Sequence, residues 1–210
     1  MEITSVRPVI AGQVPQARAV ARTAAPGDRF TGSPEALAAS VVASWRSLKA
    51  ATATSEVLAY KDGQLVRSQT IDATYEAPGC CTVAIKAGHG KGAKLEWDGG
   101  ETVTVHKGPL TFHWPLTNDK LVNPHGWTLH DTGPGMVIRM LAAPGTKVKT
   151  AGSEGGLPVL DVVSPASPAG VTREQLVIDP ARRLVTERRL YAGDALLGSM
   201  SIKAFAATGS

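Results

Sequence analysis

The feature that most constrains the fold is a two-residue period that begins after residue 64. Apolar side chains fall on alternate positions of short runs, and polar side chains fill the positions between them. Successive side chains of a β-strand point to opposite faces, so each run predicts a strand with one apolar and one wet face. Turn pairs such as Asp62-Gly63 and Gly108-Pro109 separate the runs, which predicts an antiparallel meander. The apolar positions are Leu65, Ile71, Ala73, Tyr75, Cys81, Val83, Ile85, Leu95, Trp97, Val103, Val105, Leu110, Phe112 and Trp114.

A second group of strands is expected toward the end of the chain. Turn signals at Glu154-Gly155-Gly156, Asp179-Pro180 and Gly193-Asp194 divide it into segments. With the meander they bring the predicted total to about nine to eleven strands. The expected segments are 146–150, 157–164, 173–178, 184–192 and 195–205.

Two helices are predicted, one before the strands and one between the two groups. Ser33 and Pro34 form an N-cap and a first-turn proline, and an apolar stripe at helical spacing follows through about residue 50. This stripe consists of Leu37, Val41, Trp45 and Leu48. A shorter helix is expected to begin near Pro134 and to carry Met136, Val137, Met140 and Leu141.

The chain is expected to comprise a basic extended arm or linker over residues 1–32 and one domain over 33–210. The arm holds four arginines and three prolines without a sustained period. The arm has no apolar core of the length that a secretory signal needs. No run of apolar residues in the chain is nearly as long as a membrane-spanning helix requires. At 43% hydrophobic and 19% charged residues, the composition excludes wholesale disorder.

Charge and motifs exclude several functions. The formal net charge is only +4 and its cations are scattered, without a recognition motif, so nucleic acid is not an expected partner. No GxSxG elbow, P-loop, dinucleotide fingerprint or HExxH motif is present, so we expect neither an enzyme nor a cofactor.

Cysteines and histidines leave two interpretations open. Cys80 and Cys81 are adjacent, which suits two small partly buried thiols better than a disulfide or a zinc site, although a redox-active or metal-binding pair stays an alternative. All five histidines lie between His89 and His130. His106 and His113 alternate with apolar strand positions and are expected to face solvent, whereas a metal site using His125 and His130 is the less favoured alternative. We therefore assign no metal ligand.

The arrangement over residues 33–205 resembles the LolA/LolB-like family of lipoprotein-localisation carriers. The resemblance rests on turn and alternation signals and not on a catalytic signature. The segments that carry it are the helix with Trp45 and Leu48, Tyr60-Lys61-Asp62-Gly63, Tyr75-Glu76-Ala77-Pro78, Leu95-Glu96-Trp97-Asp98-Gly99, Val177-Ile178-Asp179-Pro180, Leu190-Tyr191 and Phe205.

This resemblance implies an α+β fold in which a strongly curved antiparallel sheet, an open half-barrel, carries helices over its concave face. Such a fold would hold a lipid or lipoprotein acyl chain between sheet and helical lid, without catalysis, as a monomer with at most transient contact with a membrane surface. The residues expected to line the cavity are Leu37, Val41, Trp45, Leu48, Ile71, Tyr75, Val83, Ile85, Leu95, Trp97, Val103, Phe112, Trp114, Met136 and Met140. Core filling is the competing interpretation for the tryptophans.

Two departures from the family pattern bear on location. There is no lipid-attachment cysteine near residue 1, which disfavours an anchored acceptor of the LolB type, and no export signal is readable. The periplasm or cell envelope is expected if that signal is absent from this chain, and the cytoplasm otherwise. A fully packed β-rich interaction or scaffold domain is the alternative function, followed by a His-dependent metal-binding protein.

Overall fold

Residues 32–76, 80–132 and 134–208 are described by the computed structural model, and their strands form one antiparallel sheet. The sheet has eleven strands in the order β6-β5-β4-β3-β2-β1-β11-β10-β9-β8-β7. Its strands are β1 (Ala50–Lys61), β2 (Gln64–Glu76), β3 (Cys80–Gly88), β4 (Ala93–Trp97), β5 (Thr102–Lys107), β6 (Leu110–Pro115), β7 (Lys147–Glu154), β8 (Leu157–Val163), β9 (Arg173–Asp179), β10 (Leu184–Ala192) and β11 (Ala195–Thr208).

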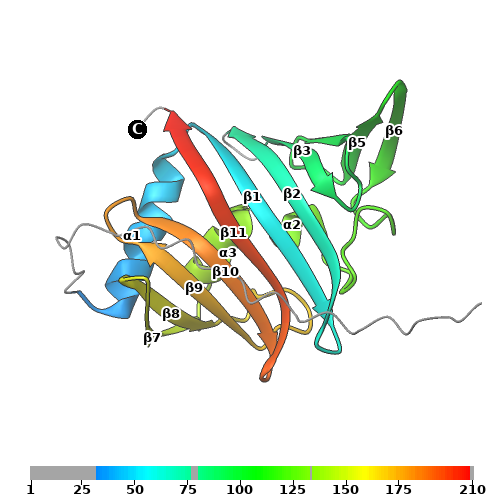
Figure 1. The fold of residues 1–210 in the computed structure, drawn as a ribbon. Coiled ribbons are helices and arrows are strands. Elements are labelled where there is room, and N and C mark those ends of the chain that lie inside the picture. Colours follow the sequence, from blue (N-terminus) through cyan, green and yellow to red (C-terminus); the bar gives the residue numbers. More distant parts are fainter. Residues whose placement is uncertain (1–31, 77–79, 133, 209–210) are drawn as a thin grey trace, which may run out of the picture.

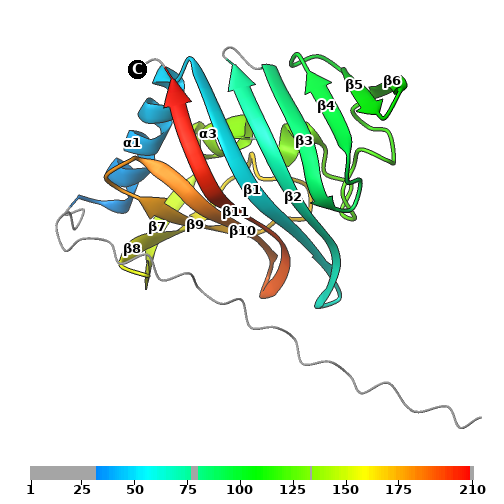
Figure 2. The same cartoon turned by 45° about the horizontal axis from the view of Figure 1, so that its top comes forward.

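This strand order describes two meanders joined along β1 and β11. One runs outward from β1 to β6 and the other from β11 back to β7, so β6 and β7 are the two edges and the sheet does not close. Three helices, α1 (Pro34–Ser47), α2 (Leu129–Thr132) and α3 (Pro134–Ala142), complete the described elements. Figures 1 and 2 show them on one side of the curved sheet. The α+β half-barrel expected from the sequence is confirmed.

Helix α1 forms where the sequence predicts it and ends slightly earlier. The Ser33 hydroxyl accepts a hydrogen bond from the Ala36 N–H at 3.2 Å, and Pro34 occupies the first turn. Leu48 is already extended, with φ −69° and ψ 129°, because β1 begins two residues later. The helix therefore stops at Ser47 instead of reaching residue 50.

Two elements lack a periodic signal in the sequence. Most side chains of β1 are small or polar, so large apolar residues do not alternate with polar ones along it. The sequence of β1 alone therefore does not predict a strand. α2 is only four residues long, too short for a helical stripe. The short helix predicted near Pro134 is present as α3.

The apolar side chains gather into two clusters on the concave side. The lid cluster joins α1 and α3 to strands β8, β9 and β10, and its buried members are Leu37, Ala38, Val41, Trp45, Met136, Val137, Met140, Leu160, Val162, Leu176, Ile178, Leu184 and Val185. The meander cluster has the buried centre Val83, Leu95, Val103 and Val105 on β3 to β5. The core is thus divided along the sheet.

None of the described helices is both long and apolar enough to cross a membrane. The predicted arm over residues 1–32 falls, except for Gly32, outside the described residues.

Candidate ligand-binding site

Cross-strand pairing aligns the alternating residues of the meander into two rows on one face of the sheet. One row runs Ala73, Val83, Leu95, Val105 and Phe112 from β2 to β6. The second row runs Tyr75, Cys81, Trp97, Val103 and Trp114 across the same strands. The period in the sequence therefore becomes a continuous apolar wall.

Burial falls from the centre of this wall toward its rim. Val103 and Val105 on β5 are 0% and 4% exposed, whereas Phe112 and Trp114 on the edge strand β6 are only half-buried. Those two rings stack with centroids 5.2 Å apart, and the Lys120 ammonium lies 5.3 Å from the Trp114 ring centre. The rim thus presents aromatic surface that the fold does not cover.

The segment between β6 and α3 lies against this wall and adds apolar side chains to it. Leu116, Leu121 and Leu129 pack on the meander cluster while remaining partly exposed. Arg67 on β2 donates a hydrogen bond to the Val122 carbonyl at 3.0 Å, and the burial that accompanies this contact lowers the pKa of Arg67. The segment is therefore attached to the sheet by a polar contact at its middle.

Trp127 and His125 attach the same segment to the centre of the sheet. The Trp127 indole donates to the Ala169 carbonyl at 2.9 Å and packs against the ring of His125, with centroids 4.8 Å apart. His125 Nε2 lies 2.7 Å from the Tyr60 carbonyl and 3.0 Å from the Leu197 carbonyl. Gly198 faces Trp127, and a Cβ there would sit 3.5 Å from the indole. The rings of His125 and Trp127 thus both contact backbone carbonyls of the fold.

Between the two clusters lies an ion pair with almost no solvent exposure. Glu174 on β9 and Arg188 on β10 are 0% and 1% exposed, and Arg188 Nε donates to Glu174 Oε2 at 2.6 Å. Arg188 Nη1 also donates to the Asp131 carbonyl of α2 at 3.3 Å. In the same helix, the His130 ring meets Trp97 edge-on with centroids 6.2 Å apart. α2 therefore connects the buried pair to the meander cluster.

The structure divides fourteen of the fifteen predicted cavity residues between the two clusters. Six of them belong to the lid cluster or pack on it, namely Leu37, Val41, Trp45, Leu48, Met136 and Met140. Eight belong to the meander cluster or pack on it, namely Ile71, Val83, Ile85, Leu95, Trp97, Val103, Phe112 and Trp114. Tyr75 is half-buried at the end of its row and is part of neither cluster.

Sequence reasoning missed the buried pair and the covering leucines. A signal for Glu174 does exist, because it occupies the same strand phase as Leu176 and Ile178 and so places a carboxylate on the apolar side of β9. The leucines of the segment after β6 have no period from which their contacts could be predicted.

A hollow of about 620 Å³ lies over the meander strands, and its lining mixes Cys81 and Trp97 with polar side chains. Thr74, Thr82, Glu96 and Thr104 pair across β2 to β5 in the phase opposite to the apolar wall, and all four line it. A hydrogen bond from Lys94 lowers the pKa of Glu96. Carboxylates and threonines thus make up much of the lining of this hollow, so we place the candidate acyl site on the apolar wall and not here.

Histidine and cysteine positions give no metal site in the described residues, where no group of three or more His, Cys, Asp or Glu side chains could hold an ion. His113 is exposed and His106 half-buried, with their Nδ1 atoms 3.1 Å from the hydroxyls of Thr104 and Thr111. Cys81 is half-buried in the second row of the wall, and the side chain of Cys80 lies outside the description.

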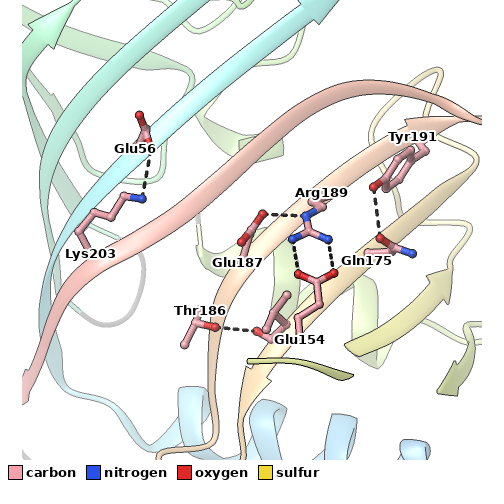
Figure 3. A network of polar contacts seen from close by, with 9 residues as sticks. Glu56, Glu154, Gln175, Thr186, Glu187, Arg189, Tyr191 and Lys203 are labelled. Atoms are coloured by element: carbon pink, nitrogen blue, oxygen red, sulfur yellow. Dashed lines mark hydrogen bonds and ion pairs between the residues drawn. The ribbon is translucent and has the colours of Figure 1, made fainter. Parts of the chain in front are cut away.

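The other face of the sheet over β7 to β11 carries a network of polar contacts around Arg189 (Figure 3). Arg189 forms two hydrogen bonds of 2.6 Å with the carboxylate of Glu154 and one of 2.7 Å with Glu187. These contacts lower the pKa of Glu154 and raise the pKa of Arg189 further above its ordinary value. On the neighbouring strands, Lys203 pairs with Glu56 at 3.1 Å. Solvent reaches this network, because the side chains of Arg189 and Glu154 are 20% and 48% exposed.

Comparison of the sequence with protein-family models found no match, and comparison with curated proteins found none. Comparison of structures did find matches. A putative outer membrane lipoprotein-sorting protein domain from Vibrio parahaemolyticus aligns at 10% identity and a TM-score of 0.50, covering 83% of this chain and 92% of that one. The chain has a LolA-like fold. An uncharacterized conserved protein from Thermus thermophilus shares it at 9% identity and a TM-score of 0.52, over 84% of this chain and 88% of that one. At these identities the likeness concerns the LolA-like fold alone.

Proposed function

We propose that this chain binds an acyl chain of a lipid or lipoprotein on the meander cluster, without catalysis and as a monomer. The observation that carries the proposal is the gradient of burial along the apolar wall, from a sealed centre at Val103 to half-exposed rings at Phe112 and Trp114. The open sheet and the LolA-like fold support it.

The lid cluster contributes stability in this proposal, and the meander cluster contributes the ligand surface. Val41 and Met140 are 0% exposed, so α1 and α3 already fill their side of the concave face. Apolar side chains that remain half-exposed gain free energy when a hydrocarbon covers them. Each methylene transferred from water contributes about 0.8 kcal/mol, so an acyl chain needs few polar contacts for useful affinity.

Solvent extraction and native mass spectrometry of the purified full chain test the proposal. We expect a co-purifying acyl species and saturable binding of a fluorescent fatty-acid probe. Phe112→Asp places a charge on the apolar wall and should abolish probe binding. Thr111→Asp, on the opposite face of the same edge strand, is the matched control and should bind normally. A chain that binds no acyl probe and yields no lipid contradicts the proposal.

Location in the periplasm or cell envelope is part of the same proposal and is supported by the fold shared with a lipoprotein-sorting domain. Fractionation of cells that express the gene from its own start tests it. Recovery in the periplasmic or envelope fraction supports the proposal, and recovery only in the cytoplasm contradicts it.

A packed interaction or scaffold domain is the second candidate, favoured by the complete burial of the lid cluster. It predicts that the half-exposed side chains of the meander cluster contact another protein and not a lipid. The Phe112→Asp and Thr111→Asp variants then bind acyl probes equally poorly, which separates the two candidates.

A further inference from the structure

The buried ion pair between the clusters has polar atoms left over. Arg188 uses Nε for Glu174 and Nη1 for the Asp131 carbonyl. Its Nη2 is buried without a hydrogen-bond partner among the described residues, and so is Oε1 of Glu174. A buried donor or acceptor that lacks a partner is costly, since it has lost its water and gained nothing in return.

The two leftover atoms have complementary chemistry. One is an N–H donor and the other a carboxylate acceptor, and they belong to two side chains that a hydrogen bond of 2.6 Å joins from Arg188 Nε to Glu174 Oε2. A group that satisfies both must accept one hydrogen bond and donate another. A hydroxyl does this. A carboxylate or an ester carbonyl can only accept.

Charge around the pair also favours a neutral group. The negative charge of Glu174 balances the positive charge of Arg188, and the negative charge of Asp131 on α2 acts on the nearby Arg139. An added carboxylate would approach the buried charge of Glu174 without a free cation to compensate it.

The pair is linked to the apolar wall through α2. The Asp131 carbonyl accepts a hydrogen bond from Arg188, while Leu129 and His130 of the same short helix contact the meander cluster. Arg139 of α3 donates to the His130 carbonyl at 2.6 Å, so α2 is held by two arginines. An acyl chain on the wall would thus have its polar end beside α2.

We infer that Arg188 and Glu174 form a head-group subsite for a neutral, hydroxyl-bearing acyl lipid. This inference rests on the proposed function and specifies its ligand class. The hydroxyl accepts from Arg188 Nη2 and donates to Glu174 Oε1, while the hydrocarbon covers the meander cluster. Entry of the head group requires α2 to move aside from Arg188.

Binding of three probes to the full chain tests the inference without any variant. Monooleoylglycerol has a hydroxyl, methyl oleate is neutral but only accepts, and oleate is an anion that only accepts. Hydrogen bonds to charged groups are stronger than neutral ones, so we expect monooleoylglycerol to bind about tenfold more tightly than methyl oleate, and oleate more weakly than monooleoylglycerol. Equal affinities for monooleoylglycerol and methyl oleate overturn the head-group subsite and leave acyl binding intact. Failure of all three probes to bind overturns the proposed function and the subsite with it.

A double variant then locates the preference. E174L/R188M removes both charges at nearly constant volume, so neither partner is left buried and alone. The affinities of monooleoylglycerol and methyl oleate should become equal, so that the preference for monooleoylglycerol vanishes. E187L/R189M removes an ion pair from the same strand on its other face and should keep the preference. A preference that survives E174L/R188M contradicts the assignment to this pair.

Discussion

Trp45 of α1 meets Phe205 of β11 edge to face, with ring centroids 5.8 Å apart and planes inclined by 64°. The contact joins the first described helix to the last strand of the chain across the concave face. Trp45 is only 7% exposed and belongs to the lid cluster, where the surrounding side chains leave it almost no contact with solvent. Its structural setting is that of a core residue.

Trp45→Ala should therefore lower the free energy of unfolding by about 3–5 kcal/mol, because it removes a large buried ring from packed surroundings. Urea unfolding followed by circular dichroism measures this loss. Acyl-probe binding by the fraction that remains folded should change little. A stable variant that has lost probe binding would instead place Trp45 in the wall of the ligand site.

Trp114→Ala should have the opposite profile. The ring is half-exposed on the edge strand β6, so its removal leaves no sealed cavity and should cost no more than about 1–2 kcal/mol. Affinity for a fluorescent fatty-acid probe should fall about tenfold, since the stacked pair with Phe112 is lost. Displacement titrations measure the affinity. Unchanged affinity would remove the aromatic rim from the proposed site.

The period of the meander was sufficient to predict its apolar face, because pairing of β2 to β6 in register preserves the alternation from strand to strand. The same period does not predict which helices or loops cover each half of the sheet. Leu37 and Val83 are equally apolar in the sequence, yet α1 buries the first in the lid cluster and the second lies in the meander cluster. The residues predicted to line one cavity therefore lie in two separate clusters, apart from Tyr75.

Long-range contacts explain what the sequence could not predict. Glu174 is fourteen positions from Arg188, and only the antiparallel pairing of β9 with β10 brings the two side chains together. Asp131 lies fifty-seven positions from Arg188 and accepts its hydrogen bond through the backbone carbonyl. Every residue type has such a carbonyl, so the identity of residue 131 does not indicate the contact. No residue pattern encodes that contact.

Arg188→Met and Glu174→Leu should each destabilise the protein more than the two substitutions together. Either single change leaves one buried charge without its partner, which typically costs about 3–5 kcal/mol, whereas the double change leaves none. Urea unfolding of the four proteins gives the coupling free energy. Additive losses would mean that the two side chains do not depend on one another.

Acid sensitivity should depend in part on Glu154, whose carboxylate holds Arg189 in the network of Figure 3. The hydrogen bond from Arg189 lowers the pKa of Glu154 below its ordinary value of 4.5 in the folded protein. The resulting stability is complete above that value and is lost as the pH falls through the lowered pKa. Because the side chain is 48% exposed, solvent screening keeps the contribution below about 1 kcal/mol.

Glu154→Gln should therefore reduce the difference in unfolding free energy between neutral and acidic solution, mainly by lowering stability at neutral pH. Urea unfolding at pH values on either side of 4.5 measures this difference. Asp194→Asn removes a carboxylate at the exposed turn between β10 and β11 and is the control for a simple change in net charge. If both variants shift the pH profile equally, the effect arises from total charge and not from the contact between Glu154 and Arg189.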